Sequence, residues 1–484
     1  MQESAGLPCW ILHTAAPPLP SLPTLNQASY AYLASSSLTQ ESGGHRLALA
    51  TSGGRSASED LFFFSGFVQH PAVVAQSLLL LARVARTRFY VPPNALAAVL
   101  RAADPVVTST PEGLRFESFS ACCGVYARLD VDASALDIAH QSSGVTNVDV
   151  NPPLRHALAA MQSSEPLHLK IGTEALQLST AQAHIVEEKV PLPARWLKGF
   201  AETQMLCAGM ALRHVLQGPA LQQFVQALPR TSATRSVMWA TRTARSLRLA
   251  SSPSPGAVCL AGPERLRVLE PLLRFATALN AYGPETDFGS QPLPSAWVLH
   301  MPGARLTLAL SPEKARGFSG EGATLSLLAG GDAQQDADFL ASLLHFEPRI
   351  DTADLAGRAL LPEVQVAAAL NVLASSGQVG FDLASASYFH RPMPLQQHLL
   401  PDQHPRLSDA RQLIARAAVT PLAADRYAVQ SDQQRYEVLL SDAAPKYRCT
   451  CPWFAKYQGT RGPCKHVLAV HIFLDPLQPD GAPQ

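Results

Sequence analysis

The chain has 484 residues, with 38 basic and 38 acidic side chains, so its formal net charge at pH 7 is zero. This balance excludes a global basic field of the kind that wraps nucleic acid, so any nucleic-acid surface must be local. The length and the hydrophobic content of 47% predict two to four domains with packed cores.

The scattered cysteines predict a reducing compartment, and the lack of long apolar runs predicts a protein outside the membrane. Outside the C-terminal cluster described below, the cysteines are scattered: Cys9, Cys122, Cys123, Cys207 and Cys259. Such residues are usually buried small hydrophobes, and a secreted disulfide framework would be denser. We find no apolar run of about 18 to 20 residues and no signal-peptide pattern, so we expect a cytoplasmic protein without a membrane partner. The abundant Ala, Leu, Arg and Pro are typical of a soluble bacterial protein.

Residues 1–250 are expected to form an N-terminal α+β region. The first 60 residues are rich in Ser, Pro and Gly, which predicts short strands and loops. A buried segment at Leu61–Phe67 precedes a helix from His70 to Val84, and Arg86 and Arg88 suit the end of that helix. The remaining predicted elements are helices at Ala95–Ala102 and Leu154–Met161, strands at Leu114–Phe116 and Val125–Val131, and a long helical region ending near residue 228.

Polar side chains alternate with valines in the stretch Thr146–Pro153 at Asn147, Asp149 and Asn151. This pattern is compatible with a strand that presents a polar face to a ligand or metal. It is equally compatible with an edge strand that runs into a turn capping the next helix.

The most basic run in the middle of the chain follows, and Trp239 lies inside it. Its arginines are Arg230, Arg235, Arg242, Arg245 and Arg248. A basic stretch with an interleaved aromatic can bind phosphates and stack a base. The alternative, which is the commoner case, is a set of arginines on a solvated surface. The sequence leaves both interpretations open.

Residues 251–349 are predicted to hold a helix and a β-hairpin. The helix covers Pro263–Leu279, and the hairpin joins Ala296–Met301 to Ala304–Leu310 through a Pro-Gly turn. Phe318–Gly322 is rich in glycine but lacks the phosphate-loop pattern, which argues against nucleotide hydrolysis. We find no catalytic motif in the first 350 residues and expect a non-catalytic protein, with an unrecognised N-terminal active site as the alternative.

Residues 350–420 are predicted to form a winged-helix-like module. A helix from Pro362 to Ser375 precedes two short strands at Gly377–Leu383 and Ser387–His390, and another helix covers Leu407–Ala417. A helix followed by a hairpin is the core of a winged helix, which often places a helix in the DNA major groove. The predicted helix is nearly uncharged, so its use on DNA or on a protein stays open.

The tightest group of reactive residues lies in residues 421–475, ahead of a short tail at 476–484. It has the pattern C-x-C, twelve residues, C-x-H, formed by Cys449, Cys451, Cys464 and His466. Three thiolates and an imidazole meet the tetrahedral preference of Zn²⁺ and leave no position open, so we expect one structural zinc. A strand over Tyr436–Leu440, a partner strand over Tyr447–Cys451 and a helix opening at Gly462-Pro463 would form a small ββα frame around it.

This pattern, with Pro452 and Trp453 after the first pair and Lys465-His466-Val-Leu-Ala at the second, resembles the SWIM zinc finger. That module occurs in Swi/Snf-type ATPases, Mutator-type transposases and signalling proteins, and the family is proposed to bind DNA or proteins. The resemblance implies the same four ligands. More loosely, Gly144–Pro153, Leu192–Phe200 and Tyr388–Pro394 are similar to a bacterial group of SWIM-containing proteins of unassigned role.

We therefore expect an α+β adaptor that binds DNA or another nucleic acid through its C-terminal half. A protein–protein adaptor is the close alternative, and the oligomeric state cannot be predicted. The aromatics Trp453, Phe454 and Tyr457 are expected to form the small core of the finger. The nucleic-acid contacts are expected from the cations around the metal: Arg411, Arg416, Lys446, Arg448, Lys456, Arg461 and Lys465.

Overall fold

A computed structural model describes most of the chain. The described residues are 28–30, 37–41, 44–49, 62–87, 89, 105–147, 150, 152–160, 165–172, 190–192, 194–231, 237–284, 292–318, 322, 325, 332–391, 405–441 and 446–474. The predicted helix Ala95–Ala102, Arg88, Arg235 and the tail at 476–484 lie outside them.

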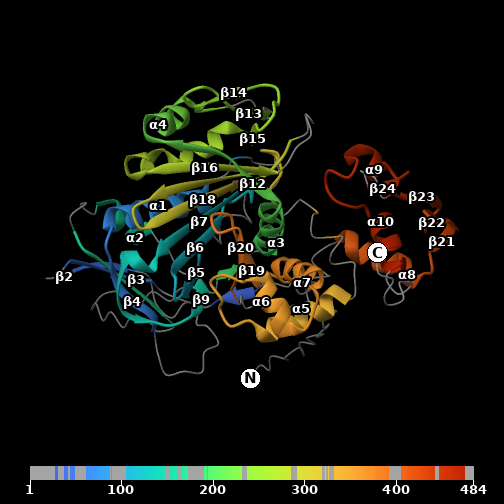
Figure 1. The fold of residues 1–484 in the computed structure, drawn as a ribbon, viewed down its shortest axis with the longest axis horizontal. Helices are drawn as coiled ribbons and strands as arrows, with labels where there is room; N and C mark the ends of the chain where they lie inside the picture. The colour runs from blue at the N-terminus through green and yellow to red at the C-terminus, as the bar shows by residue number, and fades with distance from the viewer. Residues whose placement is uncertain are drawn as a thin grey trace, which may run out of the picture.

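An eight-stranded sheet forms the centre of the fold, in the order β12-β16-β17-β18-β7-β6-β5-β9 (Figure 1). All seven pairings are antiparallel. The strands are β5 (Val106–Thr110), β6 (Gly113–Phe119), β7 (Val125–Asp132), β9 (Gly144–Asn147), β12 (Met210–Gln217), β16 (Ala278–Pro284), β17 (Ser295–Met301) and β18 (Ala304–Leu310). The predicted hairpin is confirmed as β17–β18. The sheet takes strands from both sides of residue 250, where we had placed a boundary.

The sheet bears on two sequence interpretations. The stretch Thr146–Pro153 begins in the edge strand β9, which ends at Asn147, and helix α2 starts at Pro152 (Pro152–Ala160); Asp149 and Asn151 lie outside the described residues. The long helical region predicted to end near residue 228 is wrong, because β12 separates α3 (Ala194–Ala208) from α4 (Gly218–Ala227). Gly218 has a φ of +52°, a left-handed conformation that suits glycine and ends the strand.

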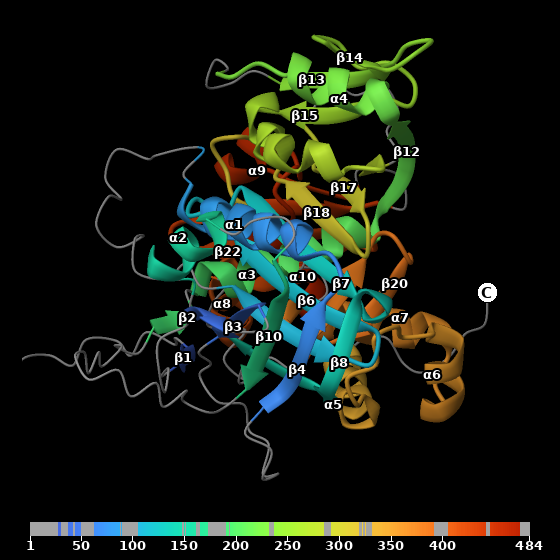
Figure 2. The same ribbon diagram turned by 90° about the vertical axis from the view of Figure 1, so that its left-hand side faces the viewer.

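One face of the sheet is apolar and is covered by helices. Phe116, Leu129, Leu306 and Leu299 are cross-strand neighbours on this face, and each is fully buried. Successive side chains of a strand point to opposite faces, so this row fixes the register of four strands. The covering layer consists of α1 (Pro71–Arg86), α2, α4 and the 3₁₀ helix η2 (Pro263–Phe275) (Figure 2).

The opposite face is divided into an aromatic half and a charged half. In the aromatic half, Phe119 and Tyr126 pack against Trp196 and Phe200 of α3. The charged half is a cross-strand row of polar residues in the order Thr108, Arg115, Asp130, Arg305. This half is covered by the next module of the chain.

That module contains three helices and a hairpin. Its elements are α5 (Asp332–Leu343), α6 (Thr352–Ala359), α7 (Glu363–Ser375), β19 (Val379–Asp382) and β20 (Ser387–His390). A single antiparallel bridge joins Ile350, between α5 and α6, to Tyr388 of β20. The predicted helix and hairpin are therefore present. The hairpin lies against the central sheet, and α7 packs on α3.

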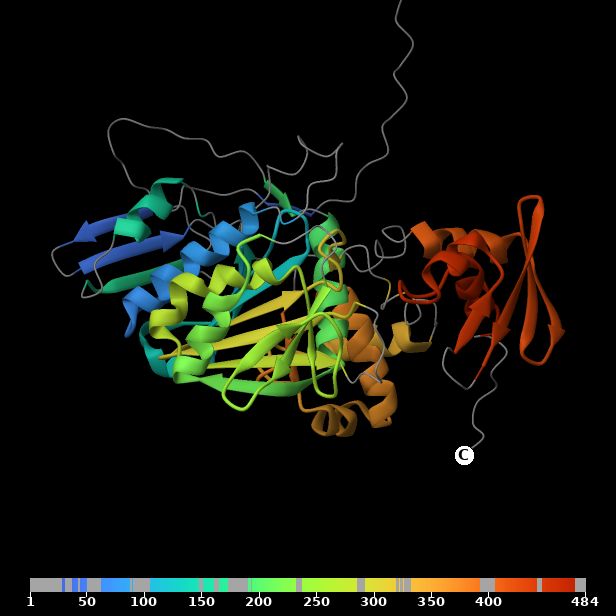
Figure 3. The ribbon, with the colours of Figure 1, turned by 90° about the horizontal axis from the view of Figure 1, so that it is seen from above.

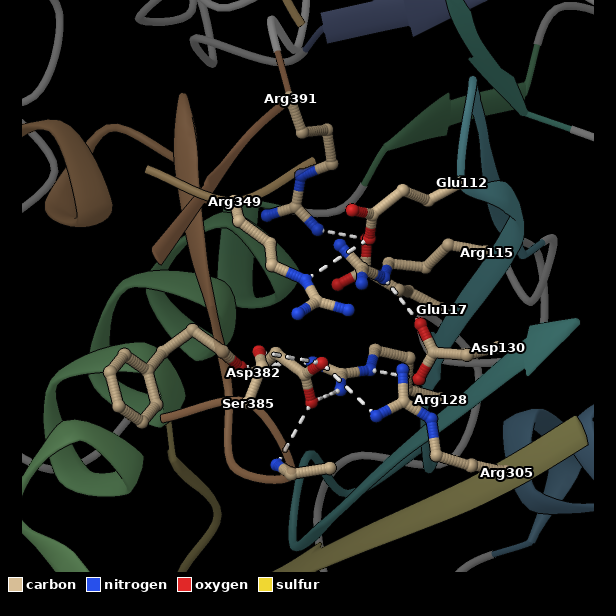
Figure 4. A network of polar contacts seen from close by, with 12 residues as sticks. Glu112, Arg115, Glu117, Arg128, Asp130, Arg305, Arg349, Asp382, Ser385 and Arg391 are labelled. Atoms are coloured by element: carbon tan, nitrogen blue, oxygen red, sulfur yellow. Dashed lines mark hydrogen bonds and ion pairs between the residues drawn. The ribbon is translucent and has the colours of Figure 1, made fainter. Parts of the chain in front are cut away.

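Buried ion pairs hold the hairpin to the sheet (Figure 4). The guanidinium of Arg128 lies 2.9 Å from Asp130 and 2.5 Å from Asp382 of β19. Asp382 also pairs with Arg305 at 3.3 Å, and its side chain is only 6% exposed. Burial alone raises the pKa of the Asp382 carboxyl, but Arg128 and Arg305 outweigh burial and hold the pKa below its ordinary value.

A second contact follows at the end of the hairpin. Arg391 donates a hydrogen bond to Glu117 of β6, and both side chains are fully buried. Phe389 of β20 lies over the guanidinium of Arg115, 3.6 Å from the ring centroid. Each of these charges therefore has a partner supplied by a distant segment, which is the condition for burying a charge.

Further sheets lie around this core. A five-stranded sheet in the order β2-β3-β10-β4-β8 adjoins α2, and a three-stranded sheet, β14-β13-β15, adjoins α4. Their strands are β2 (Ser37–Glu41), β3 (Gly44–Leu49), β4 (Phe62–Val68), β8 (Leu136–Gln141), β10 (Leu167–Gly172), β13 (Val237–Arg242), β14 (Leu247–Ala250) and β15 (Val258–Ala261), and β1 (Ala28–Tyr30) pairs with β11 (Val190–Leu192).

Trp239 of β13 is 2% exposed, so it cannot stack a base. Among the described residues, no helix is both long and apolar enough to cross a bilayer.

We expect Asp382→Ala to lower the free energy of unfolding by about 3 kcal/mol, because it removes one carboxylate from a buried arginine pair. The lowered pKa adds a pH dependence: the stabilisation is present above the unfolded pKa of about 3.9 and is lost as the pH falls through the folded value. Urea unfolding at several pH values measures both effects. Asp354→Ala removes an exposed carboxylate of α6 and is the control. It should change stability by no more than about 0.5 kcal/mol. Equal stability of the wild type and Asp382→Ala would contradict the role given to this pair.

Candidate metal centre

The C-terminal unit is a four-stranded sheet backed by helices, and it lies to one side of the other sheets (Figure 3). The sheet order is β21-β22-β23-β24, and α10 packs on both α8 and the sheet. Its elements are α8 (Pro405–Ala415), β21 (Val419–Ala423), β22 (Arg426–Ser431), β23 (Gln434–Leu440), β24 (Tyr447–Cys449), α9 (Pro452–Tyr457) and α10 (Lys465–Leu474). The predicted strand pair and final helix are therefore present. The α8 helix, which we had grouped with residues 350–420, belongs to this core.

The four predicted ligands converge at one place. Cys449 ends β24, Cys451 precedes α9, and Cys464 and His466 lie at the start of α10. Their ligand atoms all lie within 4.8 Å of one another, and all four residues are buried. Nδ1 of His466 is 3.8 Å from Sγ of Cys449 and 4.0 Å from Sγ of Cys464. Zn–S and Zn–N bonds in a tetrahedron give ligand separations of about 3.5–3.8 Å, so the residues fit one zinc ion.

The three thiols lie close enough to shift one another's pKa. Hydrogen bonding between the two side chains raises the pKa of Cys449 and lowers that of Cys451, because one thiolate accepts from the other thiol. A bound Zn²⁺ would stabilise all three thiolates at once. The ligand set is closed, so the site is structural.

Neighbouring residues orient the ligands. The Sγ atom of Cys451 accepts a hydrogen bond from the backbone N–H of Phe454 at 3.3 Å and so caps α9. The ring of Tyr436 lies on the His466 imidazole, with centroids 4.5 Å apart and planes tilted by 32°. Such contacts fix the ring for metal binding. The three cysteine ligands are part of one hydrophobic core with Val438, Val467 and Leu468.

Residues 436–473 match the family model of the SWIM zinc finger, and they contain all four ligands. This segment is a SWIM zinc finger. The match covers the end of the chain, and no curated protein matches the sequence.

Among solved structures, the chain resembles Proliferating Cellular Nuclear Antigen from Entamoeba histolytica, with 10% identity over 52% of this chain and 99% of that one. It also resembles A. fulgidus PCNA bound to the C-terminal region of FEN-1, with 9% identity over 51% of this chain and 97% of that one. The TM-score is 0.31 for both. A structural similarity this low supports no conclusion about fold or function.

The predicted nucleic-acid-binding residues fall into separate groups around the SWIM finger. Lys456, Arg461 and Lys465 lie on or beside α9 and the start of α10, while Arg411 and Arg416 are exposed on and just after α8. Arg448 lies on the sheet face that points away from the metal, because the next residue, Cys449, points inward. Lys446 is exposed just before β24.

Sequence reasoning did not find α9 or the role of Arg406. The guanidinium of Arg406 donates to the carbonyl oxygens of Arg461 and Pro463 at 2.7 and 2.9 Å, and it lies over Trp453, 4.7 Å from the ring centroid. Phe454 is buried, as predicted for the aromatics of the finger. Trp453 and Tyr457 are four residues apart, so they share one face of α9; both are only partly buried, and Trp453 packs against the finger's core.

We expect purified protein to carry one zinc per chain, and Cys464→Ser to lose it and to loosen residues 436–474. Binding free energy of a small metal site is also folding free energy, so losing one ligand should loosen the whole finger. Elemental analysis measures the zinc and hydrogen exchange measures the loosening. Cys122→Ser, outside the cluster, is the matched control and should keep the metal. Native and refolded protein that both lack zinc would contradict the site.

We expect chelation of the metal to leave the central sheet folded. The finger has its own hydrophobic core, separate from the one that joins the eight-stranded sheet to its helices. Far-UV circular dichroism before and after chelation tests this, and most of the signal should remain. Loss of the entire signal would mean that the chain unfolds as one cooperative unit.

Proposed function

We propose that the protein is a non-catalytic adaptor that binds nucleic acid through its SWIM finger. The observation that carries this proposal is a surface on α9 where cations and aromatic rings gather next to the metal. The zinc holds the shape of this surface and takes no part in chemistry. DNA is the partner we favour.

The α9 surface consists of Arg406, Trp453, Lys456, Tyr457 and Arg461. The rings of Trp453 and Tyr457 have centroids 5.0 Å apart. The guanidinium of Arg461 lies 4.3 Å from the Tyr457 ring centroid, and the ammonium of Lys456 lies 5.2 Å from it. The Tyr457 ring, tilted against Trp453, holds Lys456 and Arg461 close together at the surface, where each can contact a phosphate.

A cleft of about 630 Å³ adjoins this surface. Lys465 and Arg406 contribute cations to it, Trp453 and Tyr436 contribute rings, and Gln434 contributes an amide. Asp409 also lines the cleft and pairs with Lys465 at 3.7 Å, which lowers the local charge. Few of these groups are placed to read base edges, so we propose weak sequence preference.

The module at residues 332–391 has the element order of a winged helix, and we propose that it is winged-helix-like. Its packing favours a structural role over DNA reading. The side chains of Val366, Leu370 and Leu373 on α7 are buried, and Phe389 and Arg391 of the hairpin are buried against the sheet. We therefore assign the nucleic-acid contacts to the finger.

A protein adaptor is the second candidate, and one observation favours it. Large apolar side chains are exposed on the helices of this module: Leu360 is 90% exposed, Val364 is 81% exposed and Phe339 is 47% exposed. Exposed apolar residues of this size commonly mark a surface for another protein when they form a patch.

The variant Lys456→Ala/Lys465→Ala, called the α9 pair, tests the α9 surface together with the adjoining cleft. Each lost phosphate contact should lower the slope of log K against log[salt] by about 0.9, so the pair should lower it by about 1.8. Fluorescence anisotropy of the full chain with labelled duplex and single-stranded DNA at several salt concentrations measures the slope.

Arg426→Ala/Arg435→Ala is the matched control. It removes the same charge from exposed residues of β22 and β23. These residues lie on the face of the finger's sheet that points away from the metal, so the slope should stay nearly unchanged. Zinc content should be equal in all variants. If the α9 pair keeps its zinc and leaves the slope untouched, the protein-adaptor proposal replaces this one.

A further inference from the structure

The neutral net charge of the chain conceals a strongly basic segment. Residues 203–263 contain six arginines and no Asp, Glu or Lys. Arg242, Arg245 and Arg248 of this segment are exposed on the β13–β14 hairpin, and no ion pair with a carboxylate is found for them among the described residues. The hairpin is anchored to α4, because Ser246 Oγ donates to the carbonyl oxygen of Ala220 at 2.9 Å.

A second group of arginines lies on the neighbouring helices α1 and α2. Arg83 and Arg86 are exposed in the last turn of α1, and with Arg155 of α2 they line a cleft of about 540 Å³ that reaches Pro271 of η2. No carboxylate lines this cleft among the described residues. Arg155 also donates to the carbonyl oxygen of Val150 at 3.0 Å, which holds its side chain in place.

The two groups are joined by adjoining elements. Helix α1 packs on η2, η2 packs on α4, and α4 packs on β14. Across the described residues of α1, α2, η2, α4 and the β13–β14 hairpin, the acids are Glu264 and Glu270. Both are already paired, Glu264 with Lys314 and Glu270 with Arg267. The excess positive charge of this layer is therefore not neutralised by its own carboxylates.

We propose that α1, α2, η2, α4 and the β13–β14 hairpin, together called the helical layer, form a second nucleic-acid surface. It contacts the phosphates of a duplex through Arg83, Arg86, Arg242, Arg245 and Arg248. This surface is separate from the SWIM finger, and the proposal holds whether or not the finger binds nucleic acid. Arginine is suited to the role because its planar guanidinium binds phosphate oxygens in a bidentate manner.

The side chains of this surface favour a duplex over a single strand. Binding of single strands relies on exposed aromatic rings that stack on bases. Trp239, the aromatic residue within the basic run, is buried, and Phe224 and Trp297 stack on each other inside the core. Phe275 of η2 is partly buried, and the guanidinium of Arg274 lies 4.6 Å from its ring centroid. With the described rings of this layer buried or covered, the arginines contact the backbone, so binding should not depend on sequence.

The experiment uses the full chain and a labelled duplex of random sequence. Arg83→Ala/Arg86→Ala and Arg245→Ala/Arg248→Ala each remove two exposed arginines that have no ion pair in the described structure. Each pair should lower the slope of log K against log[salt] by about 1 to 2 and weaken binding to all sequences alike. Arg349→Ala/Arg358→Ala is the matched control, because it removes the same charge from arginines that are paired with carboxylates.

Repeating the measurement in the Lys456→Ala/Lys465→Ala background separates the two surfaces. A decrease of the slope in both backgrounds supports the helical layer independently of the finger. Slopes equal to that of the control pair, in variants with unchanged far-UV circular dichroism, would overturn the proposal. It would also be overturned if the variants lost binding to phosphatidylserine vesicles while duplex binding stayed the same, because the surface would then face a membrane.

Discussion

The buried carboxylate of Asp382 holds the helical module to the central sheet. It joins Arg128 and Arg305 of the central sheet to the hairpin, and so attaches the whole module at residues 332–391. Four buried or half-buried arginines on this sheet face and hairpin share three carboxylates, those of Asp130, Asp382 and Glu117. The basic character of the surface comes instead from uneven placement along the chain, since residues 203–263 contain six arginines and no Asp, Glu or Lys. A formal charge of zero is therefore compatible with a strongly basic segment.

The SWIM finger was predictable from sequence because its determinants are local. The four ligands lie within 18 residues, from Cys449 to His466, and Gly462-Pro463 marks the start of the last helix. The short helix α9 was not predictable, since six residues are too few to show helical periodicity. The partly buried positions of Trp453 and Tyr457 follow from that helix, whereas the sequence alone predicts that all three aromatics form the core.

The large sheet could be predicted only in pieces. The hairpin β17–β18 is local, with a Pro-Gly turn, and its sequence showed it. The pairing of β12 with β16 joins Met210 to Pro284, and the apolar pattern of β12 suits a helix as well as an edge strand. The ion pair between Arg391 and Glu117 spans 274 residues of sequence. Nothing in either local segment indicates such a partner, so the attachment of the helical module could not be derived from the sequence.

The two proposed surfaces lie on different sides of the molecule. In Figures 1 and 3, α1 and α2 lie on the far side of the central sheet from the finger. A straight, short duplex that contacts one surface therefore does not reach the other, so each contact set contributes its own salt dependence. On a long or bent nucleic acid, the second contact becomes intramolecular, and its effective concentration is set by the geometry between the sites. An adaptor built in this way gains affinity from two modest phosphate surfaces without base-specific contacts, which suits a protein whose finger is held in shape by zinc and has few base-reading side chains.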